Sequence, residues 1–192
     1  MYRILVVDDF AANAMVIKAQ LAGADADYDV RIYNSGKQVV TQLESGMTAD
    51  LVLLDINMPD MDGVQVLKRI RMIEALKKIP VIFVTGIADR NKVSEGFKYG
   101  VDDVIAKPTS ATFLRERVRR ALEGQTPLQV FKKNNDGMGR TSEYEISSLY
   151  LNVVDDYNET VLNANDRADS FGRRTEKVFG VEFPNILDCE LW

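Results

Sequence analysis

The sequence predicts an α/β fold, in which a five-stranded, doubly wound parallel sheet is followed by a mainly helical C-terminal extension. Short apolar runs alternate with helical patterns through the first two thirds of the 192 residues. Several of these runs are continuously apolar, as expected for strands that helices cover on both faces. Five repeats of a strand and a helix favour parallel strands joined by helical crossovers.

The expected strands are five short runs, each ending in or followed by polar or turn-forming residues: Ile4–Val7, Val30–Tyr33, Leu51–Leu54, Val81–Val84 and Val101–Ala106. The expected helices lie after them: Ala12–Ala22, Ser35–Glu44, Gly63–Leu76, Arg90–Tyr99 and Ala111–Glu123. The third helix has a clear apolar face, because Val64, Leu67 and Ile70 recur at three-residue spacing.

The domain organisation follows from breaks in these patterns. Residues 1–123 are expected to form one α/β domain. Residues 124–141 are rich in polar residues and glycine and are expected to form a linker. A helical pattern then begins, and 142–192 are expected to form a helical extension for dimerisation or partner binding. Its apolar residues recur in steps of four and three, close to a heptad: Ile146, Tyr150, Val153 and Tyr157.

Composition excludes several classes of function. The chain has no histidine, which excludes His-ligated metals and Ser-His or Cys-His nucleophiles, and its one cysteine, Cys189, excludes an intrachain disulfide. The net charge of −5 lies entirely in residues 124–192, so this tail is expected to repel nucleic acid. The chain has neither a signal-peptide core nor an apolar stretch of about 18 residues, so we expect a cytoplasmic protein without membrane contact.

Polar side chains follow four of the expected strands. Asp8 and Asp9, Asp55, Thr85 and Lys107 each come directly after an apolar run. Singly, each is more simply interpreted as a solvated turn, a cap or a strand residue. Because the carboxyl ends of parallel strands share one edge of a sheet, these groups should gather there. The three carboxylates would repel each other unless a cation lay among them, and hard oxygen ligands suit Mg²⁺.

Four short segments resemble the motifs of response-regulator receivers. The segment 53–63, Leu-Leu-Asp-Ile-Asn-Met-Pro-Asp-Met-Asp-Gly, is similar to the family's phosphorylation loop. The others are similar to its acid pair, its hydroxyl switch and its lysine-proline pair: Val7-Asp8-Asp9, Val84-Thr85-Gly86 and Ala106-Lys107-Pro108. Their order and spacing agree over residues 1–123, so the resemblance implies a flavodoxin-like receiver of a two-component phosphorelay.

The resemblance also implies chemistry at Asp55. This residue would accept a phosphoryl group from a histidine kinase or a phosphotransfer protein. Mg²⁺ would be the cofactor, with Asp8, Asp9, Asp55 and the backbone carbonyl of Asn57 as its ligands. The resemblance implies that the protein is not an enzyme acting on other molecules, because a receiver catalyses only its own phosphorylation and dephosphorylation.

Two further residues receive roles from the resemblance. Lys107 would pair with Asp55 and later with the phosphoryl oxygens, and its peptide bond to Pro108 is expected to be cis. Thr85 would turn its hydroxyl onto a phosphoryl oxygen. One position departs from the family pattern: Val104 stands where receivers usually carry Tyr or Phe, so either loops and helices pass on the signal or the coupling is weaker.

The function of the tail stays open between alternatives. In the first, residues 142–192 bind a protein effector or form a homodimer. In the second, the chain is a transcription regulator with an unrecognised small DNA-binding tail. In the third, it is an N-terminal fragment of a receiver-linked enzyme. A phosphatase-type hydrolase is a weaker alternative, because Asn57 occupies the position where such an enzyme needs a general acid.

Overall fold

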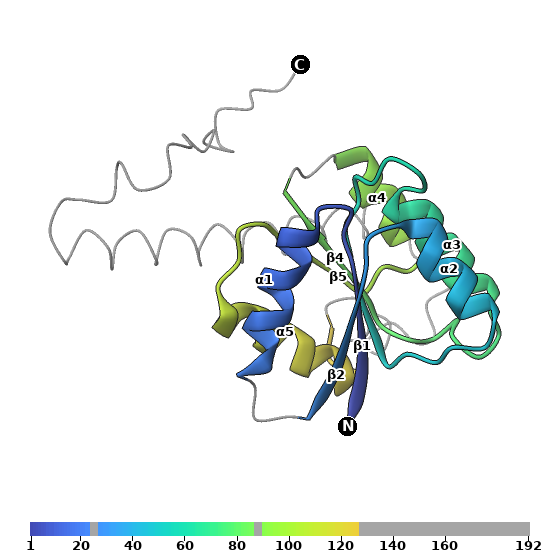
Figure 1. The fold of residues 1–192 in the computed structure, drawn as a ribbon. Helices are drawn as coiled ribbons and strands as arrows, with labels where there is room; N and C mark the ends of the chain where they lie inside the picture. The colour runs from blue at the N-terminus through green and yellow to red at the C-terminus, as the bar shows by residue number, and fades with distance from the viewer. Residues whose placement is uncertain (24–26, 87–89, 127–192) are drawn as a thin grey trace, which may run out of the picture. The chain divides into compact units, whose positions relative to one another are not determined.

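The computed structural model describes residues 1–23, 27–86 and 90–126, which form an α/β domain. All strand pairs are parallel, and the strand order is β2-β1-β3-β4-β5. The strands are β1 (Tyr2–Val7), β2 (Tyr28–Tyr33), β3 (Leu51–Leu54), β4 (Val81–Thr85) and β5 (Asp103–Ala106). The predicted doubly wound parallel sheet is therefore confirmed (Figure 1).

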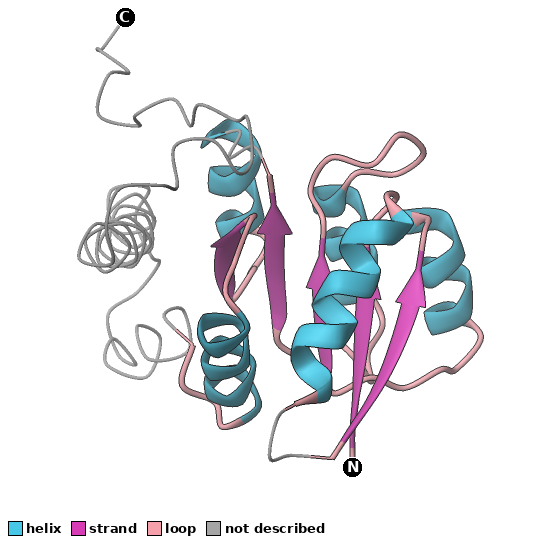
Figure 2. Ribbon diagram, turned by 60° about the vertical axis from the view of Figure 1, so that its left-hand side comes forward, coloured by secondary structure: helices cyan, strands magenta, loops and turns pink. Residues whose placement is uncertain are grey.

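Helices cover both faces of the sheet. They are α1 (Ala11–Ala22), α2 (Gly36–Glu44), α3 (Gly63–Met72), α4 (Arg90–Lys98) and α5 (Ala111–Leu122). Figures 1 and 2 show α1 and α5 together on one face and α2, α3 and α4 on the other. The crossovers therefore place all carboxyl ends of the strands at the same edge.

The core divides into two layers, one on each face of the sheet. In β1, Leu5 and Val7 belong to the layer under α2, α3 and α4, whereas Ile4 and Val6 belong to the layer under α1 and α5. Strands β3 and β4 are buried at every position. This burial explains why their sequences are continuously apolar.

Polar side chains fix the starts of three helices. Ser35, Asp62 and Ser110 each accept a hydrogen bond from a backbone N–H in the first turn of α2, α3 and α5 respectively. At Asp62 the bond is reciprocal, because the Gln65 side chain accepts from the backbone N–H of Asp62. These caps set where each helix begins after its strand.

The third helix is shorter than its apolar spacing predicts. Helix α3 ends at Met72 rather than Leu76, because Ile73 takes an extended conformation with φ −81° and ψ 113°. Leu76 is still buried in the core, reached from a turn instead of a helix. The Arg71 guanidinium donates to the carbonyl of Ile79, 2.9 Å away, and so holds this turn against the helix.

Strand β5 is also shorter than expected, since it begins at Asp103 and not at Val101. Helix α5 is followed by Gly124, whose φ of 71° lies in the left-handed region that ends helices. The predicted linker, beyond residue 126, and the predicted extension 142–192 lie outside the described residues. Within the described part, no helix has the length and apolar character that crossing a membrane requires.

Candidate functional site

Two acidic side chains lie together at the carboxyl edge of the sheet. Val7 of β1 pairs with Leu54 of β3, so Asp8 and Asp55 leave neighbouring strands at the same level. The backbone N–H of Asp55 donates to the carbonyl of Val7, 2.8 Å away. Only 2% of Asp8 and 7% of Asp55 are exposed. Two buried carboxyl groups side by side require a positive partner.

Lys107 supplies that partner from the end of β5. Its Nζ lies 2.6 Å from Asp8 Oδ2 and 2.6 Å from Asp55 Oδ1. Its backbone N–H donates to the Thr85 carbonyl at 2.8 Å, and its peptide bond to Pro108 is cis, as the resemblance implies. The ammonium thus joins residues that are 99 and 52 positions away in the sequence.

The second oxygen of Asp55 is held by the loop that follows it. The backbone N–H of Asn57 donates to Asp55 Oδ2 at 2.7 Å. At the other end of this loop, the Gly63 N–H donates to the Ile56 carbonyl at 2.9 Å. A Cβ atom on Gly63 would lie 2.4 Å from the Asp55 carbonyl oxygen, so this turn requires glycine. The loop therefore fixes the orientation of the Asp55 carboxylate.

Asp8 is positioned by the end of β2 as well as by its own turn. Its Oδ1 accepts from the Phe10 N–H at 3.0 Å, and its backbone carbonyl accepts from Asn34 Nδ2 at 2.9 Å. Sequence reasoning missed Asn34. The signal was present, because Asn34 directly follows the second strand and so belongs to the same edge of the sheet.

Thr85 lies at the same edge, at the end of β4. Its backbone pairs with Ala106 of β5, and only 1% of the residue is exposed. The structure therefore brings together the strand ends that carry Asp8, Asp55, Thr85 and Lys107. The functional roles that the sequence suggests for them remain predictions.

The predicted metal ligands are only partly gathered. Asp9 is exposed beside Asp8, and among the described residues no three acidic, cysteine or histidine side chains converge on one point. The donor set still fits Mg²⁺, because the two buried carboxylates of Asp8 and Asp55 offer hard oxygen ligands at one edge.

Lys92 of α4 contacts the loop after Asp55, which sequence reasoning did not foresee. Its Nζ lies 3.2 Å from Asn57 Oδ1 and 3.5 Å from Asp62 Oδ2. Nothing in the sequence distinguishes this residue from a solvated helix lysine. Its contacts appear only when α4 is packed beside α3.

The loop between β3 and α3 is also hydrogen-bonded to the start of α2. Asp60 Oδ2 accepts from the Ser35 hydroxyl and from the Lys37 N–H. The hydrogen bond from Ser35 lowers the pKa of the Asp60 carboxyl from 3.8 to about 2. A Cβ atom on Gly36 would lie 2.5 Å from the Met61 carbonyl oxygen, which shows how closely the loop approaches.

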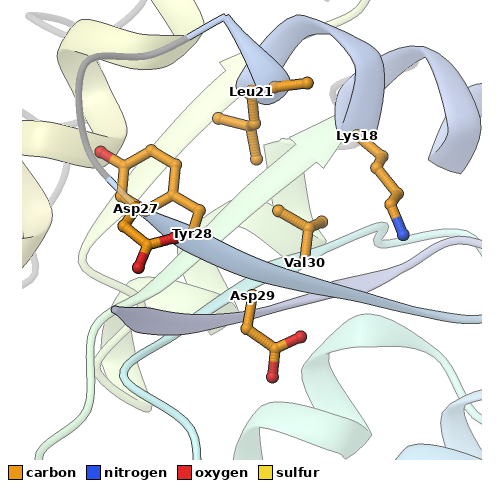
Figure 3. A pocket seen from close by; sticks show the side chains of 7 residues that line it. Lys18, Leu21, Asp27, Tyr28, Asp29 and Val30 are labelled. Carbon is orange, nitrogen blue, oxygen red and sulfur yellow. The ribbon is translucent and has the colours of Figure 1, made fainter.

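A surface hollow of about 420 Å³ lies elsewhere, at the start of β2 and the end of α1 (Figure 3). It is lined by Lys18, Leu21, Ala22, Asp27, Tyr28, Asp29 and Val30. This is the amino end of the strand, opposite the edge that carries Asp8 and Asp55. Its volume alone does not make it a candidate active site, because it lies away from the buried carboxylates and the ammonium of the acidic edge.

Comparison with known proteins identifies the family. Residues 4–119 match the family described as the response regulator receiver domain. The chain belongs to the response regulator receiver family. The resemblance carried by the four motifs is therefore confirmed, and with it the assignment to two-component signalling.

Relatives of this receiver have different lengths. It is 34% identical to the chemotaxis protein CheY of Pseudomonas aeruginosa over 127 residues, which cover 63% of this chain and 96% of CheY. It is 35% identical to a probable cyclic di-GMP phosphodiesterase of Vibrio cholerae over 133 residues, or 69% of this chain. That match spans 29% of the length of the phosphodiesterase.

Solved structures agree with the fold. The receiver domain of a sensor histidine kinase from Pseudomonas aeruginosa, described with magnesium coordinated in its active-site cleft, is 29% identical. It matches with a TM-score of 0.58 over 64% of this chain and 98% of that chain. A response regulator receiver protein from Methanospirillum hungatei is 29% identical and matches with a TM-score of 0.60, over 65% of this chain and 96% of the other.

Proposed function

We propose that this receiver takes up a phosphoryl group on Asp55, with Mg²⁺ bound beside it, and so acts as the switch of a two-component phosphorelay. The observation that carries the proposal is the position of Lys107, whose Nζ lies 2.6 Å from both Asp8 and Asp55. A carboxylate that is fixed, buried and paired with an ammonium is prepared to receive an anionic group without further reorganisation.

The donor would be a phosphohistidine of a histidine kinase or of a phosphotransfer protein, because this chain has no histidine. An Asp55 carboxylate oxygen would form the new O–P bond while the P–N bond to the donor imidazole breaks. The imidazole nitrogen keeps the electron pair of that bond and takes up a proton. The Asn57 N–H, 2.7 Å from Asp55 Oδ2, orients the attacking group.

The other residues of the edge would bind the metal ion and the phosphoryl oxygens. Asp8, Asp9, Asp55 and the Asn57 carbonyl would hold Mg²⁺, which when bound would offset charge on the phosphoryl oxygens. The Lys107 ammonium would pair with the Asp55 carboxylate before the transfer and with the phosphoryl oxygens after it. Thr85, at the end of the neighbouring strand, would donate its hydroxyl to a phosphoryl oxygen.

The test is an intact-mass measurement on the full chain after treatment with acetyl phosphate and Mg²⁺. We expect the mass to rise by one phosphoryl group, and we expect no gain in Asp55→Asn or when a chelator removes the metal. A wild-type chain that stays unmodified, or an Asp55→Asn variant that gains the same mass, would contradict the proposal.

For the output, we infer that residues 142–192 bind a protein effector or a second copy of the chain. The match to 29% of a phosphodiesterase favours a second candidate, a receiver joined to an enzyme domain in a longer protein. Light scattering with and without acetyl phosphate tests self-association. A DNA shift assay at two salt concentrations tests the transcription-regulator alternative, which requires salt-sensitive binding.

A further inference from the structure

Helix α4 presents positive charge towards the loop that carries Asp55. Its first turn contains Lys92 and no acidic residue. A cation in the first turn of a helix is disfavoured by the helix dipole, so the position needs a compensating partner. Two contacts of the Lys92 ammonium lie in this loop, with Asn57 Oδ1 at 3.2 Å and Asp62 Oδ2 at 3.5 Å.

These two partners mark the two ends of the β3–α3 loop. Asn57 lies two residues after Asp55, and its backbone N–H binds the Asp55 carboxylate. Asp62 caps α3 through its other carboxylate oxygen, which accepts from the Gln65 N–H at 2.9 Å. One ammonium on α4 therefore joins the residue beside the phosphoacceptor to the start of the next helix.

We propose that Lys92 is a positioning residue that sets the lifetime of the phosphoryl group on Asp55 by holding the Asn57 side chain. The inference rests on the proposed phosphorylation of Asp55. With its Oδ1 bound to the ammonium, the Asn57 carboxamide is held on the residue whose backbone N–H binds the Asp55 carboxylate, so it would restrict the approach of water to the acyl phosphate. Without Lys92 the carboxamide is released and water gains access.

The contact also gives the loop a direct connection to α4. Val104, which stands where receivers usually carry an aromatic residue, is buried in the same core layer as Val93 of α4 and has no ring to move. Lys92 connects the loop to α4 by a polar contact instead.

Lys68 provides a matched control. Lys68 is a lysine of α3 that contacts α4, since its Nζ lies 2.7 Å from Glu95 Oε1. The same ammonium lies over the Tyr99 ring. Both of these contacts lie on the C-terminal side of Lys92, away from Asn57. Removing Lys68 loosens α4 without removing the hydrogen bond to the carboxamide.

The experiment measures the decay of the acyl phosphate after the full chain is loaded with acetyl phosphate and Mg²⁺ and the donor is removed. We expect Lys92→Ala to shorten the lifetime about five-fold, the kinetic equivalent of one ordinary hydrogen bond at an exposed position. Asn57→Ala should shorten it similarly, and the double variant should be no faster than either single one. Lys92→Arg should restore most of the lifetime, and Lys68→Ala should leave it unchanged.

Three results would overturn the inference while leaving the proposed function intact. The first is a Lys92→Ala lifetime equal to that of the wild type. The second is an equal effect of Lys68→Ala, which would mean that loosening α4 is the cause. The third is full additivity of Lys92→Ala and Asn57→Ala. If the wild-type chain takes up no phosphoryl group at all, the proposed function itself fails and the inference falls with it.

Discussion

The Lys107 ammonium compensates the negative charge of the acidic edge, because it contacts the buried carboxyl groups of Asp8 and Asp55 at once. Replacing Lys107 by methionine keeps most of the side-chain volume and removes the charge. Without the ammonium, two buried carboxylates have no compensating positive charge, so Lys107→Met should lower the free energy of unfolding by about 2–3 kcal/mol.

Urea unfolding at neutral pH measures this change. Lys77→Met is the matched control, because Lys77 is exposed and pairs with the exposed Glu74 at 2.5 Å. Its effect should stay within about 0.5 kcal/mol. Equal stability of Lys107→Met and the wild type would show that the ammonium does not compensate the two carboxyl groups.

Asp103 is a buried acid that the site does not use. Burial raises the pKa of its carboxyl from 3.8 to about 6, although Arg117, 3.3 Å away, opposes the shift. Between these two values the folded protein keeps a proton that the unfolded chain releases. Asp103 therefore adds stability that is fully present below pH 3.8 and is lost as the pH rises through about 6.

Urea unfolding of the wild type and of Asp103→Asn over a pH series tests this assignment. As the pH falls from 7 to 4, the wild type should gain on the order of 2 kcal/mol relative to Asp103→Asn. Parallel stability profiles of the two proteins across this range would mean that Asp103 titrates normally.

At the scale of elements, the β3–α3 loop is anchored to α2 through Ser35. This hydroxyl donates to Asp60 and also accepts from the Gln38 N–H at 3.2 Å, so it caps the helix and holds the loop. Ser35→Ala should lower the free energy of unfolding by about 1 kcal/mol or somewhat more. It should also return the pKa of Asp60 from about 2 towards 3.8.

Denaturant unfolding and NMR titration of the Asp60 carboxyl measure the two effects. Ser45→Ala is the control at the other end of α2, where the hydroxyl bonds only within the last turn, to the Thr41 carbonyl at 2.7 Å. If Ser35→Ala left the Asp60 pKa at about 2, the hydroxyl would not be its cause.

At the scale of the whole molecule, the sequence predicts what is local or repeated. Continuous apolar runs such as Leu51–Leu54 predict buried strands, and parallel strands then place Asp8, Asp55 and Lys107 at one edge. The prediction fails where a side chain from one element decides the geometry of another. The early end of α3 is an example, because Arg71 holds the following turn by donating to a carbonyl eight residues away, and the local apolar spacing does not predict that contact.

The same reason explains why sequence reasoning missed Lys92. Lys92 reaches Asn57 across 35 positions of sequence, and only the packing of α4 against its neighbours brings them together. The predicted tail lies outside the described residues, so its expected role in self-association or partner binding remains a prediction.

The position of the phosphoryl group tests the account most directly. The full chain is loaded with acetyl phosphate and Mg²⁺, and borohydride then reduces the acyl phosphate and converts an aspartyl phosphate to homoserine. Tandem mass spectrometry of the resulting peptides locates the reduced residue. The account predicts homoserine at position 55 and nowhere else. Reduction at Asp8 or Asp9, or at any other carboxyl group in place of Asp55, would contradict it.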